Sequence, residues 1–202
     1  MSSAIGAQYD KIAKWWQDYH TSSNYGAAQL TRALKFAKPG GKALDVGCGS
    51  GGRLIKLLED AGFKVTGLDA SSQMIALAQA NHSGADFVHA DIQQWDSDQT
   101  FDFILAWDSL FHLPLAAQRP VLEKLCGLLS KGGVMLHSFG DDIGEHTDVW
   151  KGQTFAYSSI GIAANIDILN RSDLYVRHLE LDQYPEKHAF IISQKLTDMV
   201  DC

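Results

Sequence analysis

A run of glycines after a short apolar segment constrains this chain more than any other feature. Residues 43–46 (Ala-Leu-Asp-Val) are typical of a buried strand, and the segment 47–52 that follows contains four glycines. Glycine has no Cβ, so it adopts positive φ values and lets another molecule approach the main chain. A helix predicted from Arg53 onward would direct its free N–H groups into the same space. The loop is therefore predicted to hold a nucleotide-like cofactor.

The glycine loop alone leaves two cofactor classes open. Three of its glycines have the G-x-G-x-x-G spacing of dinucleotide-binding folds, which by itself is a weak signal. A second predicted strand, residues 64–68, ends in Asp69, where an acid suits a ribose diol. A third predicted strand, residues 86–92, carries Asp91, where an acid suits an adenine amino group and has no general use in nicotinamide binding.

Five segments, in order, resemble the motifs of the class I S-adenosylmethionine-dependent methyltransferases. They are 44–51 (LDVGCGSG), 67–69 (GLD), 90–92 (ADI), 101–108 (FDFILAWD) and 128–136 (LLSKGGVML). The resemblance covers most of the chain. It implies an α/β, Rossmann-like, doubly wound sheet of seven strands, mostly parallel, with helices on both faces. It also implies an antiparallel C-terminal hairpin whose last strand lies between the fifth and sixth strands.

The same resemblance implies S-adenosylmethionine as cofactor and S-adenosylhomocysteine as product. Gly47 and Gly49 would face the methionyl part, Asp69 would bind both ribose hydroxyls, and Asp91 with the Ile92 amide would bind the adenine edge. The other cofactor-binding candidates are Asp45, Cys48, Gly51, Arg53, Ala70, Met74 and Trp107.

Several of these residues have alternative interpretations. Arg53 opposes the dipole of the helix it begins, which points to a nearby anion such as the cofactor carboxylate; the alternative is an exposed arginine. Taken singly, Asp69 and Asp91 are also compatible with a helix cap or a solvated loop acid. Cys48, between two glycines, is expected to be a packed thiol.

Asp108 and His112 are the candidate catalytic residues. Both follow the predicted fourth strand, in the loop that by the resemblance borders the transferred methyl group. Histidine has an unperturbed pKa near neutrality, so His112 is suited to accept a proton from the methyl acceptor. The alternative is a histidine bonded to backbone in a turn. Asp108 is suited to orient the acceptor or to lie beside the sulfonium.

The chain is expected to form one domain, residues 1–202, in three parts. Residues 1–41 are predicted to form two helices, 42–139 the cofactor-binding core, and 140–202 a substrate-side segment with the terminal hairpin. The first helix has an aromatic face that either packs in the core or forms a lid over the cofactor: Tyr9, Ile12, Trp16 and Tyr19. In the last part we expect an extended segment (154–158), a helix (160–170) and two strands (174–181 and 188–194).

Charge, hydropathy and cysteine content limit the kinds of partner and the location that we expect for this chain. The net charge of −7 and the lack of a Lys/Arg stripe exclude a nucleic-acid partner, because such binding depends on neutralising phosphates. No apolar run reaches the ~20 residues of a membrane helix. The three cysteines, Cys48, Cys126 and Cys202, have no plausible pairing, which favours a reducing, cytoplasmic location. The spacing of the candidate metal ligands matches no known zinc arrangement, so no metal is expected. These candidates are His137, Glu145, His146 and Asp148.

The sequence thus predicts an enzyme that moves a methyl group to an unidentified small molecule by in-line displacement, as a monomer or homodimer. Two alternatives remain open. One is a nicotinamide-dependent reductase on a similar sheet, and the other is a non-catalytic S-adenosylmethionine-binding regulatory protein.

Overall fold

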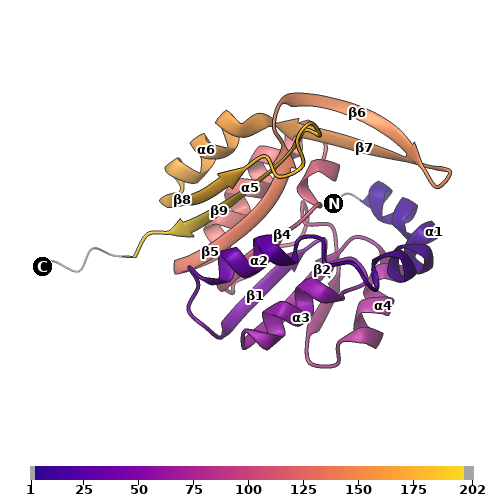
Figure 1. The fold of residues 1–202 in the computed structure, drawn as a ribbon, viewed down its shortest axis with the longest axis horizontal. Helices are drawn as coiled ribbons and strands as arrows, with labels where there is room; N and C mark the ends of the chain where they lie inside the picture. Colours follow the sequence, from indigo (N-terminus) through magenta and orange to yellow (C-terminus); the bar gives the residue numbers. More distant parts are fainter. Residues whose placement is uncertain (1–2, 198–202) are drawn as a thin grey trace, which may run out of the picture.

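Seven strands form one sheet, in the order β3–β2–β1–β4–β5–β9–β8 (Figure 1). In this computed structural model, which describes residues 3–197, they are β1 (Gly41–Val46), β2 (Phe63–Asp69), β3 (Asp86–His89), β4 (Phe101–Ala106), β5 (Leu129–Gly140), β8 (Leu174–Glu180) and β9 (His188–Lys195). Strands β1 to β5 run parallel, whereas β9 is antiparallel to both of its neighbours. This confirms the predicted sheet, including the final strand that lies between β5 and β8.

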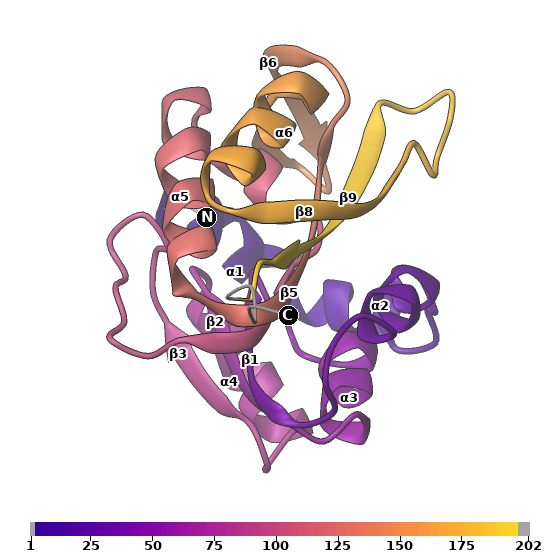
Figure 2. The ribbon, with the colours of Figure 1, turned by 90° about the vertical axis from the view of Figure 1, so that its left-hand side faces the viewer.

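Helices cover both faces of the sheet (Figure 2). On one face lie α2 (Ala27–Leu34), α3 (Arg53–Asp60) and α4 (Ser72–Asn81), and on the other lie α5 (Leu115–Leu128) and α6 (Gly161–Arg171). Neighbouring residues of a strand point to opposite faces. In β4, Ile104 packs with the core under α5 and α6, and Leu105 with the core under α2 to α4. Both are fully buried, which explains the apolar run of residues 103–106 in this strand.

The N-terminal helix and a separate hairpin lie beyond the carboxyl ends of the strands. Helix α1 (Ser3–His20) contacts α4 and β7, and β6 (Ile143–Trp150) pairs antiparallel with β7 (Gln153–Ile160) (Figure 1). Trp15 and Trp16 of α1 meet the Trp150 ring edge-on, with centroids 4.8 and 5.7 Å apart. Lys11 also donates a hydrogen bond to the Gln153 side chain. Helix α1 and the hairpin are therefore joined by aromatic and polar contacts.

Two local expectations were wrong and one element was missed. The strand expected over residues 86–92 ends at His89, because the Asp91 carboxylate accepts the backbone N–H of Gln93 and closes a turn. Tyr19 is 65% exposed and stacks on Trp15 instead of joining the buried aromatic face. Strand β6 was not predicted, because it is almost entirely exposed and shows no alternating pattern of burial.

Candidate functional site

The glycine loop between β1 and α3 is held in place from both sides. Its Gly49 N–H donates to the Asp69 carboxylate at 2.9 Å, and its Gly52 N–H donates to Nε2 of His82 at 2.9 Å. Asn81, at the end of α4, donates its side-chain amide to the Ser50 carbonyl at 2.9 Å. The glycines at 47, 49, 51 and 52 all have positive φ, a conformation that other residues adopt only with strain. The loop is thus fixed with its backbone facing outward.

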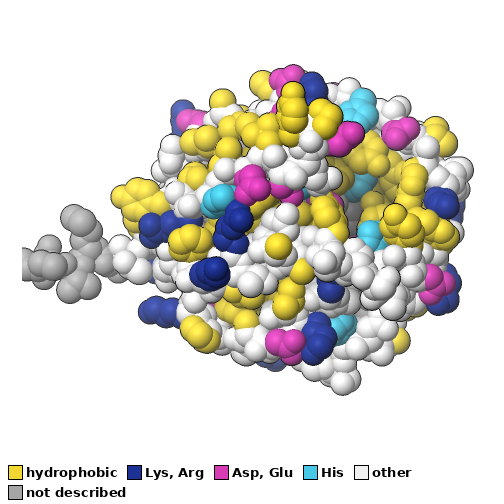
Figure 3. All heavy atoms as spheres, in the orientation of Figure 1, with side chains coloured by type: hydrophobic (Ala, Val, Ile, Leu, Met, Phe, Trp, Pro, Cys, Tyr) yellow, Lys and Arg dark blue, Asp and Glu magenta, His cyan; other side chains and the backbone are white. Residues whose placement is uncertain are grey.

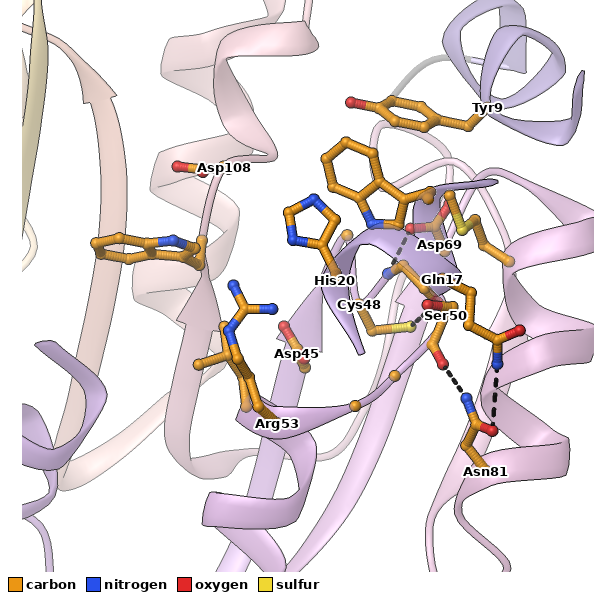
Figure 4. Close-up of a pocket in the computed structure, with 18 of the residues that line it drawn as sticks. Tyr9, Gln17, His20, Asp45, Cys48, Ser50, Arg53, Asp69, Asn81 and Asp108 are labelled. Atoms are coloured by element: carbon orange, nitrogen blue, oxygen red, sulfur yellow. Dashed lines mark hydrogen bonds between the residues drawn. The ribbon is translucent and has the colours of Figure 1, made fainter. Parts of the chain in front are cut away.

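A cavity of about 300 Å³ lies in front of this loop. We call it the first cavity. Its other walls come from the ends of β2 and β4, from α4 and from the inner face of α1, which contributes Tyr9, Trp16 and His20. Figure 4 shows Arg53 reaching up from the start of α3 toward His20 and Asp108. In the space-filling view the surface is hollowed below the hairpin, with histidine and hydrophobic side chains at the rim (Figure 3).

Two buried carboxyl groups face this cavity. Asp45 and Asp69 are 4% and 1% exposed. Burial and, to a smaller extent, the nearby Asp69 charge raise the pKa of Asp45 to about 7, although Arg53 opposes the shift. Burial also raises the pKa of Asp69, although backbone N–H groups of Ser71 and Gly49 oppose the shift. This end of the cavity therefore favours a ligand that brings hydroxyl donors or positive charge.

Polar groups of His20 and Arg53 line the other side of the cavity. Nδ1 of His20 is buried and, among residues 3–197, has no hydrogen-bond partner; Nε1 of Trp107 also has none, but it lies against Gly26. Arg53 donates Nε–H to the Tyr25 carbonyl. Within the described part of the chain, Arg53 forms no ion pair, and burial lowers its pKa. Buried polar groups left unpaired are costly, so these donors indicate a site for a ligand that carries acceptor atoms or negative charge.

The comparisons with known proteins agree with this geometry. A family model described as "methyltransferase domain" matches residues 43–133. A trans-aconitate 2-methyltransferase of Escherichia coli is 32% identical over 161 residues, and a malonyl-[acyl-carrier protein] O-methyltransferase of Enterobacter lignolyticus is 28% identical over 150 residues. Each alignment covers 73% of this chain, and the chain spans 63% and 59% of the length of these two relatives.

Solved structures show the same fold. A 1,6-didemethyltoxoflavin-N1-methyltransferase of Burkholderia thailandensis superposes with a TM-score of 0.74 at 17% identity, covering 96% of this chain and 88% of that one. The domain-model match, the relatives and the shared fold together support a class I S-adenosylmethionine-dependent methyltransferase. The family-model match runs from β1 into the start of β5; it contains four of the five sequence motifs and overlaps the fifth, residues 128–136.

Within this class I methyltransferase fold, most of the predicted site residues meet at the first cavity. Its wall includes Asp45, Gly47, Cys48, Gly49, Gly51, Arg53, Asp69, Met74, Trp107 and Asp108. Cys48 is a buried thiol whose pKa burial raises, as expected for a packed cysteine. Cys126 is also buried and free, whereas Cys202 lies outside the described residues. Four predicted residues do not line the cavity: Ala70, Asp91, Ile92 and His112.

Helix α1 covers the end of β2, next to three of these residues. Asp10 accepts hydrogen bonds from the Ser71 hydroxyl at 2.6 Å and from the Gln73 N–H at 3.0 Å. Gly6 packs so closely on Ala70 that a Cβ at this position would overlap the Ala70 carbonyl. The cavity thus ends before Asp91, and the adenine-binding role expected of Asp91 and its neighbours stays a prediction.

His112 lies behind Tyr9 rather than in the cavity wall. It is 2% exposed, and its Nδ1 lies 2.9 Å from the Ala156 carbonyl. A carbonyl can only accept, so Nδ1 carries the proton and Nε2 accepts the Tyr9 hydroxyl at 2.9 Å. Burial lowers the pKa of His112 to about 4. In this arrangement His112 is neutral and contacts the cavity through Tyr9.

Asp108 is held by residues that sequence reasoning missed. Its carboxylate accepts the Ser138 hydroxyl at 2.9 Å and lies 2.9 Å from Nε2 of His188. The other ring nitrogen of His188 lies 2.6 Å from the Asp182 carboxylate. His188 is 80 positions from Asp108 in the chain, so no local pattern could have revealed the contact. Asp108 also has a positive φ of 51°, an uncommon conformation for a residue other than glycine.

The described residues were also compared with the requirements of a membrane span and of a metal site. No helix of residues 3–197 combines the length and apolarity of a membrane span. Over the same range, His, Cys, Asp and Glu side chains form no group of three or more with the geometry of a metal site.

Proposed function

We propose that this chain binds S-adenosylmethionine in the first cavity and transfers its methyl group to a small molecule. The observation that carries the proposal is the polarity of that cavity. Two buried acids, Asp45 and Asp69, line it on one side, and the Arg53 guanidinium and the unpartnered Nδ1 of His20 line it on the other. A volume of about 300 Å³ lies at the lower end of the ~300–1,000 Å³ range of ligand sites.

The amino-acid part of the cofactor fits between these groups. Its carboxylate would pair with the Arg53 guanidinium, whose Nε–H already donates to the Tyr25 carbonyl, and would accept a hydrogen bond from Nδ1 of His20, which has no partner among residues 3–197. Its ammonium group and sulfonium would bring positive charge near Asp45, whose carboxyl is destabilised as an anion by burial and by Asp69. Gly47 and Gly49 would let this part approach the backbone.

Asp69 is placed to bind the ribose. Each of its oxygens accepts one backbone N–H, from Gly49 at 2.9 Å and from Ser71 at 2.8 Å. A carboxylate oxygen has a second lone pair, so each can also accept a ribose hydroxyl. Met74 lines the cavity beside Asp69, where it would pack near the adenine ring.

Helix α1 acts as a lid in this proposal. It contributes Tyr9 and Trp16 to the cavity wall and is fastened to the start of α4 through Asp10. Opening of α1 would uncover the end of β2 and give the adenine access to Asp91 and Ile92. Closed, α1 excludes water from the reacting atoms.

The methyl group of a sulfonium is already activated, so the chemistry supplied by the cofactor needs no protein nucleophile. The residues of this chain have to align the acceptor and exclude water. Tyr9 and Trp107 supply aromatic surface, which is attractive to positive charge. Asp108 is the charged group at the acceptor end, and His112 acts through the Tyr9 hydroxyl.

The wider setting is also part of the proposal. The chain is expected to function as a single domain in the cytoplasm, as a monomer or homodimer, on a small molecule rather than on nucleic acid. A net charge of −7 supports the last point, and the buried free thiols of Cys48 and Cys126 support a reducing compartment.

Tryptophan fluorescence tests the cofactor class directly, because Trp16 and Trp107 line the cavity. Saturable changes in fluorescence are expected with S-adenosylmethionine and S-adenosylhomocysteine and not with NADH. Binding of NADH alone would support the reductase alternative. A protein that binds S-adenosylmethionine but methylates no compound of a broad acceptor screen would support the regulatory one.

A further inference from the structure

Asp108 forms part of the partition between two cavities. It lines the first cavity, while its partner His188 lines a second cavity of about 430 Å³ enclosed by the hairpin, the end of β5 and the start of β9. The second cavity has aromatic walls at Phe111, Phe139 and Tyr157. A flat or ring-shaped acceptor in this second cavity would contact His188 and would have to extend past it to reach Asp108, which lines the first cavity.

The Asp108 carboxylate is fixed at this border. His188 binds it at 2.9 Å and is itself held by Asp182 at 2.6 Å, while Ser138 bonds both its backbone N–H and its carboxylate. Side-chain exposures of 12% for His188 and 5% for Asp182 show that this support is largely shielded from water. Asp108 has a positive φ of 51°, and residues in such sparsely populated conformations cluster at functional sites.

The charges around the partition disfavour an anionic acceptor. With His188 protonated, Asp108 and Asp182 leave the cluster with one net negative charge, and Arg53, the cation that interacts with Asp108 from the first cavity, would be paired there with the cofactor carboxylate. Burial alone lowers the pKa of His188, but hydrogen bonds and charges from Asp108 and Asp182 outweigh it and raise the pKa. The group that faces His188 from the α1–α2 connection is the Tyr25 hydroxyl, at 3.5 Å.

The rim of the second cavity adds further acids. Asp142, Glu145 and Glu186 lie there with one lysine, Lys187, which is paired with Asp142 at 3.3 Å. An approaching carboxylate would therefore meet repulsion at the rim and again at Asp108. A neutral or cationic acceptor would meet no such repulsion.

We infer that the acceptor is a ring compound methylated at a hydroxyl or amine, with Asp108 receiving its proton and His188 and Asp182 positioning Asp108. This rests on the proposed methyl transfer. In the step, the bond from the methyl carbon to the acceptor oxygen or nitrogen forms as its bond to sulfur breaks. The bonding pair stays on sulfur, which becomes a neutral thioether, and the acceptor proton passes to Asp108. The inference departs from the carboxylate substrates that the names of several relatives indicate.

A panel of matched acceptors with tritium-labelled S-adenosylmethionine tests the substrate class. Phenols, anilines and hydroxyindoles are compared with the benzoates and indole carboxylates of the same rings, and trans-aconitate is included. Label is expected in the hydroxyl and amine compounds only. Label in the carboxylates or in trans-aconitate overturns the inference.

Variants locate the proton acceptor. Asp108→Asn keeps a residue that tolerates positive φ and should slow transfer to the labelled compound by about 10²-fold or more, with S-adenosylhomocysteine affinity nearly unchanged. Asp148→Asn, at an exposed acid of β6, is the control and should retain full activity. His188→Gln should alter the pH profile of transfer. An unchanged rate in Asp108→Asn contradicts the inference.

Nitrogen-15 NMR of the histidine rings tests whether His188 positions Asp108, even if no compound of the panel is labelled. In the complex with S-adenosylhomocysteine, His188 should titrate above an ordinary histidine, and Asp108→Asn should lower that titration point by about one pH unit or more. Equal titration of His188 in both proteins overturns the inference. Absence of S-adenosylhomocysteine binding would instead reject the proposed function.

Discussion

The buried carboxyl of Asp45 should make the stability of the free protein depend on pH in a direction opposite to that of most aspartates. Its pKa of about 7 lies well above the ordinary value of 3.8, because burial and the neighbouring Asp69 disfavour its charge. Between these two pH values the folded protein holds a proton that the unfolded chain has released. Stability is therefore lost as pH rises.

The size of the effect follows from the pKa difference. Each pH unit between the two pKa values is worth about 1.4 kcal/mol. From pH 5 to pH 7 and above, the wild-type protein should lose about 3 kcal/mol relative to an Asp45→Asn variant, which cannot ionise at this position. The buried histidines His112 and His137, whose pKa values are lowered by burial, titrate in both proteins and cancel in the comparison.

Urea unfolding of both proteins at several pH values between 5 and 8.5 measures this difference. The free energy of unfolding of Asp45→Asn should exceed that of the wild type by an amount that grows with pH up to about 7 and then stays constant. Asp98→Asn, at an exposed acid, serves as control and should parallel the wild type. Parallel profiles for Asp45→Asn and wild type would refute the electrostatic account of the cavity.

Two further predictions concern α1 and the residues behind it. Asp10→Ala removes a carboxylate that accepts the Ser71 hydroxyl and an α4 backbone N–H, which should weaken the attachment of α1 by about 1–2 kcal/mol. Hydrogen exchange of α1 should be faster in this variant and unchanged in the exposed control Asp18→Ala, and equal protection in all three proteins would contradict the lid. Once an acceptor is known, His112→Ala should slow methyl transfer by about 10²-fold, because Tyr9 in the cavity wall loses the hydrogen bond that positions it. If His112 acts through Tyr9, the double variant with Tyr9→Phe should be no slower, whereas additive losses would place His112 on the acceptor itself.

The parallel half of the fold could be predicted from the sequence because its signals are local. Central strands such as 43–46 carry mostly apolar side chains since both faces of the sheet are covered, and an acid or glycines mark their carboxyl ends. The helix cap at Ser71, which accepts the Met74 N–H, is equally local. Strand β6 gave no such signal because its side chains are exposed on a hairpin without a core of its own.

The site could be predicted only where it follows the strand ends. Asp45 and Asp69 terminate neighbouring parallel strands, so their meeting at one cavity follows from topology. The contact between Asp108 and His188 depends on the antiparallel insertion of β9 next to β5, which brings distant positions together. The burial of His112 depends on α1 and β7 packing around it, so its position after β4 alone suggested a more accessible role.

The ribose-binding role of Asp69 is the central claim, and calorimetry with S-adenosylhomocysteine tests it most directly. The wild-type protein should bind one equivalent. Asp69→Ala should lose roughly 1.5–3 kcal/mol of affinity, because two ribose hydroxyls would be left without their charged acceptor. Asp86→Ala, at an exposed acid of the edge strand β3, should bind like the wild type. No binding by the wild type, or unchanged affinity in Asp69→Ala, would contradict the account.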